Sequence, residues 1–375
     1  MFADEMDILS LSRWRGTCRT NYHHASFSMR RSLTSRIRAF TPYPQELVDT
    51  VTRYGAVIGG ELALSFFLRN ETYEARCLDI YASHFHFEKL CDELLHSTSL
   101  QPHIAQHSVD THSLYYALRR LVSASLVIRL HNSRVVYVHR SYTCSSSAPL
   151  TRAPCTALSN FVTGFSFGCS HPELTLAHRA LLADRELVYL STHDANSLNH
   201  LLSNKFSLAV APTAWADYRR DMIENSLRNP EECWRERHIC PKQGRFFGDR
   251  GSLVGYFDPL GNDEDRCTRG NIAPFGAMAV WRLMSSFECE GGCEHLDEVL
   301  DYGVTSIPVL FRKDPYGDLL DCILDKRLGV SPLYPRPPVN RALSSYNFTT
   351  HSNRAELIYK HVVPTSPPLE IIPYT

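Results

Sequence analysis

A strand, a Gly-Gly turn, a buried helix and a second strand follow one another between residues 54 and 83, and this order constrains the fold more than any other feature. The segment reads YGAVIGGELALSFFLRNETYEARCLDIYAS. Its apolar pattern predicts strands at 56–58 and 78–81 and a helix at 61–68, with Gly59 and Gly60 in the turn between them. The predicted helix is apolar nearly all round, so we expect it to be buried.

The rest of the chain predicts further helices and strands around this unit. We expect helices within 1–40 and at 45–53, 85–95, 174–190, 195–202 and 217–227, and strands at 121–130 and 135–139. Strands that alternate with helices favour an α/β or α+β fold with a mixed sheet and flanking helices. Residues 240–275 are rich in Gly, Asp and Arg and predict a long loop region. The predicted units are 1–44 (N-terminal helices), 45–180 (core), 181–330 (helical, cysteine-containing) and 331–375 (Pro-rich tail).

The Gly-Gly turn and the following acidic strand carry a resemblance to a known family. Ile58-Gly59-Gly60 followed by Leu78-Asp79-Ile80-Tyr81 resembles the core motifs of the nucleotidyltransferase superfamily, and in particular a group of uncharacterised fungal proteins with a degenerate form of that fold. The resemblance implies that the backbone amides of Gly59 and Gly60 face phosphate and that Asp79 holds a catalytic metal ion, normally Mg²⁺. It covers residues 50–180.

Two departures from the family pattern predict that catalysis is lost. Cys77 stands where the resemblance implies a first acid, and a soft thiolate suits zinc, whereas Mg²⁺ needs hard oxygen ligands. No Asp or Glu occurs from Thr111 to Pro172, so a later strand in this window cannot supply a third acid. The window contains arginines instead, at positions 119, 120, 129, 134, 140 and 152.

We therefore expect a catalytically degenerate protein that binds a nucleotide or RNA or serves as a scaffold. Arginines in place of carboxylates would let an anion bind without metal, although solvated arginines explain the same pattern. The alternative is an active Mg²⁺-dependent nucleotidyltransferase that uses Asp79, helped by Glu61 or Glu74. A strand-end acid with a purely structural role is the other interpretation of Asp79.

A second cluster raises the question of zinc. Cys289 and Cys293 are spaced as a pair of zinc ligands, with His295 nearby, but no second pair at matching spacing follows. Buried free thiols are the simpler explanation of these cysteines. The chain has 18 histidines, so the sequence does not single out any pair of them.

The N-terminal helices suggest a different class of function. Residues 7–13 (DILSLSR) followed by Cys18-Arg19 resemble the later half of an F-box, which implies a Skp1-like adaptor as partner. The opening Leu-Pro segment of an F-box is missing. The alternative is an ordinary helical hairpin that packs on the main domain.

Composition narrows the classes of protein to which this chain can belong. A formal net charge of −1 and 43% apolar residues are typical of a soluble globular protein without a general affinity for nucleic acid. No apolar run is long enough to span a bilayer, and the N-terminus is unlike a signal peptide, so we expect a cytoplasmic or nuclear protein with no membrane partner. In that setting the 12 cysteines are expected to be reduced.

Overall fold

The computed structural model describes residues 2–69, 73–96, 100, 102–108, 121–142, 145–183, 191–220, 237–241, 243, 245–247, 249–257, 279–281, 283 and 307–308. Its helices are α1 (Phe2–Glu5), α2 (Ile8–Arg15), α3 (Arg19–Ile37), α4 (Pro44–Arg53), α5 (Gly60–Phe67), α6 (Phe87–His96), α8 (Pro172–Leu176) and α9 (Thr192–Ser203). Short 3-10 helices lie at Ala148–Arg152, Thr156–Leu158 and Pro212–Ala214. The predicted Pro-rich tail lies outside the described residues.

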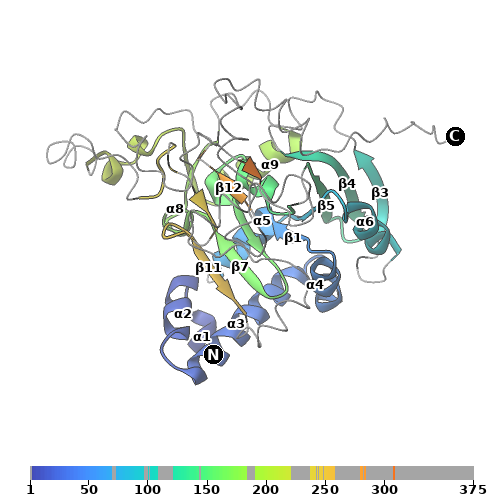
Figure 1. The fold of residues 1–375 in the computed structure, drawn as a ribbon, viewed down its shortest axis with the longest axis horizontal. Helices are drawn as coiled ribbons and strands as arrows, with labels where there is room; N and C mark the ends of the chain where they lie inside the picture. The colour runs from blue at the N-terminus through green and yellow to red at the C-terminus, as the bar shows by residue number, and fades with distance from the viewer. Residues whose placement is uncertain are drawn as a thin grey trace, which may run out of the picture.

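Eight strands form one mixed sheet in the order β11-β7-β6-β1-β2-β5-β4-β3. Figure 1 shows β3, β4 and β5 at one edge of the sheet and β7 and β11 toward the other. The strands are β1 (Val57–Gly59), β2 (Cys77–Ala82), β3 (Pro102–Ser108), β4 (Val122–Leu130), β5 (Val135–Ser141), β6 (Asn160–Val162), β7 (Ser166–Cys169) and β11 (Leu253–Tyr256). Only β2 and β5 pair in parallel; the other neighbours in this sheet are antiparallel. The expected mixed α/β architecture is therefore confirmed.

Two smaller sheets accompany the large one. One contains β10 (Arg245–Phe246), β12 (Ala279–Trp281) and β13 (Ile307–Pro308). The other pairs β8 (Arg179–Leu181) with β9 (Ser207–Ala209) in parallel.

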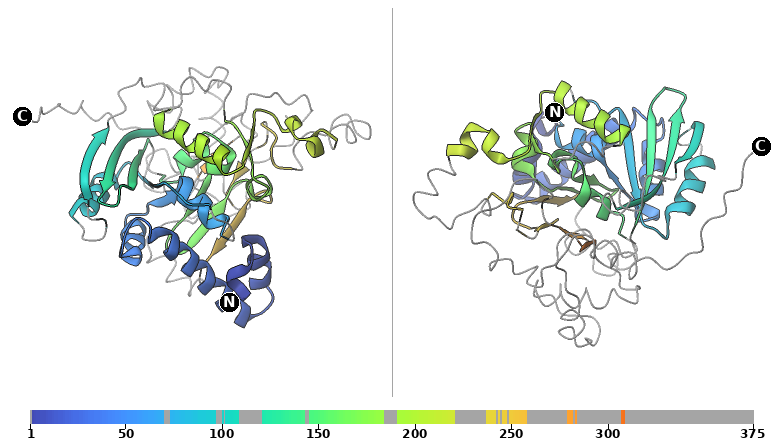
Figure 2. Two further views of the ribbon diagram at one scale, coloured as in Figure 1. Left: turned by 180° about the vertical axis from the view of Figure 1, so that it is seen from behind. Right: turned by 90° about the horizontal axis from the view of Figure 1, so that it is seen from above.

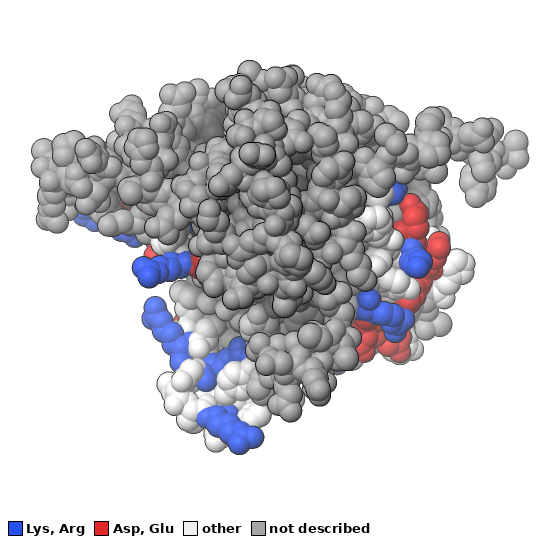
Figure 3. Space-filling view, in the orientation of Figure 1, with Lys and Arg blue, Asp and Glu red and all other residues white. Residues whose placement is uncertain are grey.

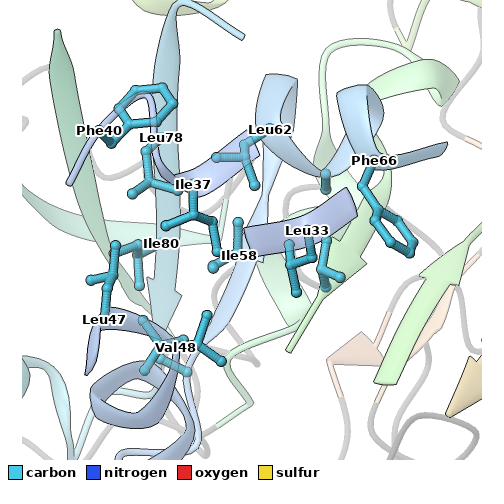
Figure 4. Close-up of a cluster of buried hydrophobic side chains, with 14 of the residues drawn as sticks. Leu33, Ile37, Phe40, Leu47, Val48, Ile58, Leu62, Phe66, Leu78 and Ile80 are labelled. Atoms are coloured by element: carbon cyan, nitrogen blue, oxygen red, sulfur yellow. The ribbon is translucent and has the colours of Figure 1, made fainter. Parts of the chain in front are cut away.

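The main hydrophobic core lies between one face of the large sheet and the helices α3, α4 and α5. Strand alternation points Leu78 and Ile80 of β2 to this face, where both are fully buried. Leu33 and Ile37 of α3 pack in the same cluster, as Figure 4 shows. The N-terminal helices thus belong to the core, because Ile8 and Leu11 of α2 are also buried in it. Those two side chains serve packing, and the F-box-like interpretation of these helices stays a prediction.

Two predicted segments differ in the structure. The helix expected at 174–190 ends after α8, because His178 takes a left-handed conformation (φ 52°) and β8 begins at Arg179. The loop expected at 240–275 contains β10 and β11, and β11 extends the large sheet beyond residue 180 by pairing with β7. Leu253, Val254 and Tyr256 give β11 its strand character, which the surrounding polar composition obscures.

The described helices include none that is both long enough and apolar enough to span a membrane.

Candidate metal centre

Two neighbouring strands bring polar side chains to the sheet face opposite the core. Cys77 and Asp79 alternate with the core residues of β2, so they share this other face. The parallel strand β5 lies beside β2, with Tyr137 opposite Asp79 and His139 opposite Tyr81. The strand next to the predicted acid therefore presents aromatic and imidazole side chains at the positions nearest to it.

Helix α9 supplies another histidine from a distant part of the chain. The helix begins at Thr192 because Ser191 is its N-cap, with the Ser191 hydroxyl accepting a hydrogen bond from the Asp194 amide at 3.0 Å. Leu198 and Leu201 bury its apolar face in a second hydrophobic cluster. These contacts hold the first turn of α9, and with it His193, over β2. The helix is the long yellow-green one near the centre of Figure 2, left.

The Asp79 carboxylate lies at the centre of this group and is 1% exposed. Its Oδ1 atom is 2.8 Å from Nε2 of His193 and 3.2 Å from Nε2 of His139. The Cys77 thiol donates to Oδ2 at a sulfur–oxygen distance of 3.6 Å. One carboxylate thus holds together two imidazoles and a thiol.

Electrostatics favour a charged Asp79–His193 pair. Burial alone would raise the pKa of Asp79, but the positive charge of His193 and the hydrogen bonds from both histidines outweigh burial and hold the pKa below its ordinary value. Burial alone would lower the pKa of His193, yet the Asp79 carboxylate outweighs it and raises that pKa. The two groups therefore stabilise each other's charged forms.

Cys77 behaves differently from its neighbours. Burial raises the pKa of its thiol well above the ordinary value, and the charges of Asp79 and Glu61 raise it further. The side chain is therefore a thiol when no cation is near, and a metal ion must displace its proton to bind the sulfur.

Outer residues fix the orientation of the two histidines. The Ser125 hydroxyl lies 2.8 Å from Nδ1 of His139, on the side away from Asp79. A hydroxyl can donate or accept, so it suits either tautomer of the ring. Tyr81 stacks on His139 with ring centroids 4.9 Å apart, and the ring centroids of Tyr137 and His193 are 4.1 Å apart.

The predicted Gly-Gly turn packs directly against the side chains of the site. Gly60 has φ +59°, and a Cβ atom built on it would lie 2.1 Å from Oδ2 of Asp79. A Cβ atom on Gly59 would lie 2.6 Å from Leu150 and 2.7 Å from Tyr81. The space next to both glycines is thus filled by the protein's own side chains, and their expected role toward phosphate stays a prediction.

The two other acids expected to assist Asp79 have different partners. Glu61 is buried and accepts hydrogen bonds from the Arg76 amide and from Nη2 of Arg76, both at 2.9 Å. Glu74 is largely exposed and lies 3.8 Å from Nη2 of Arg134. Carboxylate oxygens are therefore supplied to this site by Asp79.

Two arginines from the segment without Asp or Glu, residues 111–172, have partners away from Asp79. Arg134 donates to the backbone carbonyl of Ala75, and Arg140 lies 3.5 Å from Glu88. Arg119 and Arg120 are outside the described residues. The hydrogen bond of Arg134 and the ion pair of Arg140 are thus made away from Asp79.

A metal ion fits the Cys77–Asp79–His193 group better than any other described cluster. One donor atom from each of these residues lies within 4.8 Å of the other two, and this is the one such group of three found among the described residues. Tetrahedral zinc needs donor atoms about 3.3–3.8 Å apart, so Nε2 of His193, 2.8 Å from Oδ1 of Asp79, would move outward to admit an ion. The other predicted zinc ligands, Cys289 and Cys293, lie outside the described residues.

The sequence pattern predicts a role for Asp79 and the soft character of Cys77 but indicates neither histidine. His139 and His193 are 60 and 114 residues from Asp79 along the chain. The alternation of β5 could have indicated that His139 shares a face with Tyr137. No local signal relates either of them to His193.

Comparisons with known proteins gave no support for or against these assignments. No family model matches the chain, and neither the curated proteins nor the solved structures searched contain a significant match.

Proposed function

We propose that this chain is a catalytically degenerate nucleotidyltransferase-like protein in which one transition-metal site takes the place of a magnesium pair. The observation that carries the proposal is the set of groups around Asp79. They are the thiol of Cys77 and the imidazoles of His193 and His139, and no second carboxylate is among them within the described residues.

This donor set is unfavourable for two-metal nucleotidyl transfer. Mg²⁺ prefers oxygen ligands in near-octahedral geometry and is held by carboxylates together with substrate phosphates. One buried carboxylate that two histidines already contact cannot bridge two such ions. Magnesium-dependent catalysis through Asp79 therefore has little support in the geometry, and it is the alternative that experiment should address.

The same donor set is favourable for zinc. Thiolate, imidazole and carboxylate are all common zinc ligands, and three of them converge here. His139, which lies 3.2 Å from Asp79 but outside this group of three, is the candidate for the fourth position and would have to move toward the ion. A site closed by four protein ligands is structural, so the ion would fasten helix α9 to strand β2. The protein would then act by binding, as a scaffold, with nucleotide, RNA or a Skp1-like adaptor as its predicted partners.

Isothermal titration calorimetry on the chelator-treated full chain tests this proposal. The wild type should bind at least one Zn²⁺ ion per chain, one of them at the Cys77 site. It should bind Mg²⁺ weakly or not at all. Replacement of the thiol in Cys77→Asp should weaken Zn²⁺ binding and strengthen Mg²⁺ binding, because a hard oxygen replaces a soft sulfur. The double variant Cys289→Ser/Cys293→Ser is the matched control, since it removes the other cysteine pair and keeps this site.

A radiolabelled-nucleotide incorporation assay addresses the alternative. Magnesium-dependent transfer from a nucleoside triphosphate that disappears in Asp79→Ala would overturn the proposal and establish an enzyme. Absence of Zn²⁺ binding at Cys77 would equally contradict it.

A further inference from the structure

A second feature, an arginine-rich cavity, lies next to α3. The cavity has a volume of about 890 Å³. It is lined by residues of α3, by the segments that follow α3 and α5, and by the segments that precede β2 and β5. Its volume is that of a small-molecule site.

The charges that line this cavity are strongly unbalanced. Six arginines contribute to it, namely Arg30, Arg31, Arg36, Arg38, Arg69 and Arg134, against two acids, Asp4 and Glu74. Serine and threonine hydroxyls of α3 line it as well. Figure 3 shows basic side chains in blue on the N-terminal helices, at the lower left of the molecule. A concave surface of this composition is positively charged, although the whole chain has a net charge of −1.

Arg69 is the arginine of this cavity whose hydrogen bonds are incomplete within the described residues. Its Nη2 atom donates to the Ser28 hydroxyl at 2.6 Å. Its Nε and Nη1 atoms are buried and donate no hydrogen bond to any residue that the structure describes. Unsatisfied buried donors of a charged group are costly, so a movement of the Arg69 side chain toward an anion in the cavity would be favourable.

Arg36 holds the backbone around Arg69 in place. Its Nη1 atom donates to the Tyr73 carbonyl at 2.7 Å, and Nη2 donates to the Arg69 carbonyl at 3.2 Å. Burial lowers the pKa of both Arg36 and Arg69. Two partly buried guanidinium groups thus lie in one cavity, where Glu74 and Asp4 act on their charges, and an added anion would further offset the cost of burial.

We infer that this cavity binds a compact organic polyphosphate, a small molecule with several phosphate groups. Phosphate oxygens match the planar donor geometry of guanidinium groups, and several arginines distributed around one cavity suit several phosphates better than a single one. The inference concerns a different surface from the metal centre and does not depend on it.

Calorimetry on the full chain with inositol hexakisphosphate as the probe tests the inference. The titration is run in the presence of a metal chelator, so that binding through zinc does not contribute. The wild type should bind with a stoichiometry of one, and the affinity should fall as salt is raised. Sulfate and inorganic phosphate should bind far more weakly, because each presents one tetrahedral group.

Variants then locate the site. Arg69→Gln should weaken binding by about tenfold or more, since it removes a charged donor. Arg38→Gln changes an exposed side chain and should weaken binding without disturbing the fold. It therefore tests the site even if the Arg69→Gln variant does not fold. Arg19→Gln is the matched control, because Arg19 is exposed on the same helix and is not a lining residue.

Three results would overturn the inference. They are no binding of the probe, equal losses in Arg19→Gln and Arg38→Gln, and tighter binding of single-stranded RNA that depends equally on all three arginines. The last result would show a diffuse nucleic-acid surface.

Discussion

His193 Nε2 lies 2.8 Å from Asp79 Oδ1, and this contact joins the first turn of α9 to the middle of β2 across 114 residues of the chain. It brings an imidazole to a carboxylate that already has a thiol beside it. Each residue favours the charged form of the other, and a cation that binds here must displace the proton of His193. The proposed metal site depends on this one long-range contact.

Loss of the His193 ligand should abolish tight zinc binding at this site. His193→Gln removes the imidazole. Loss of a residue that only contacts a ligand lowers metal affinity by about 10–100-fold, and we expect loss of this ligand itself to lower zinc affinity by more. Competition titration against a chromogenic chelator measures the change. His200→Gln on the same helix is the control and should retain the wild-type affinity. Equal affinities for the His193 variant and the wild type would exclude His193 as a ligand.

Ser125 should have a smaller effect than His193, because it acts through His139. Its hydroxyl is 2.8 Å from Nδ1 of His139, the nitrogen that faces away from Asp79. If His139 is the fourth ligand, Ser125→Ala should reduce zinc affinity by about 10–100-fold. The same competition titration gives the answer, with Ser123→Ala on the same strand as the control. An unchanged affinity would place His139 outside the metal shell.

The site could be predicted from the sequence only along β2 and the turn before it. Alternation and turn chemistry are local, so β1, α5 and β2 were expected close to their observed bounds, and Asp79 and Cys77 were identified as neighbours. The pairing of β2 with β5, which places Tyr137 and His139 beside Asp79, is non-local and has no spacing rule. His193 depends on how α9 packs through Leu198 and Leu201. Such contacts follow from tertiary packing, which one sequence does not specify.

The two segments that were predicted wrongly also depend on tertiary contacts. The apolar pattern at 174–190 suits a helix, but parallel pairing of β8 with β9 competes for Arg179, Ala180 and Leu181. Strand β11 is only four residues long, so its apolar residues form a strand only because β7 pairs with it. Short strands gain their stability from partners, so composition alone misses them.

Gly60 should tolerate no side chain. Gly60→Ala would force Cβ to within 2.1 Å of Asp79 Oδ2 in a backbone with φ +59°. The backbone strain alone costs about 1–3 kcal/mol, and the displaced carboxylate adds to it. Urea unfolding should show this loss of stability. Gly16→Ala is the control, because Gly16 has φ −73° and its added Cβ would meet Arg13 O at 3.4 Å. Equal stabilities for the two variants would contradict the observed turn.

His171 should make the protein less stable in mild acid. Burial, together with the charges of Arg245 and His238, holds the pKa of this histidine well below its ordinary value of about 6.5. The unfolded chain takes up a proton at that pH and the folded chain does not, so stability falls as the pH drops below about 6.5. The contribution of one such histidine reaches about 1.4 kcal/mol per pH unit.

Urea unfolding between pH 7 and pH 5 tests the role of His171. The slope of stability against pH should become shallower in His171→Gln and stay unchanged in His24→Gln, which alters an exposed histidine of α3. His193 acts in the opposite sense, because its raised pKa adds stability that is lost as the pH rises. The comparison of variants separates the two effects. A slope that His171→Gln leaves unchanged would contradict the assignment.

Cobalt substitution tests the central claim most directly, because Co²⁺ occupies zinc sites and reports sulfur ligation by its charge-transfer absorption. The chelator-treated full chain is titrated with Co²⁺ and its near-ultraviolet and visible spectra are recorded. The account predicts a thiolate-to-cobalt band that persists in Cys289→Ser/Cys293→Ser and disappears in Cys77→Ser. A band that instead disappears in the double variant and persists in Cys77→Ser, or no band at all, would contradict a metal centre at Cys77, Asp79 and His193.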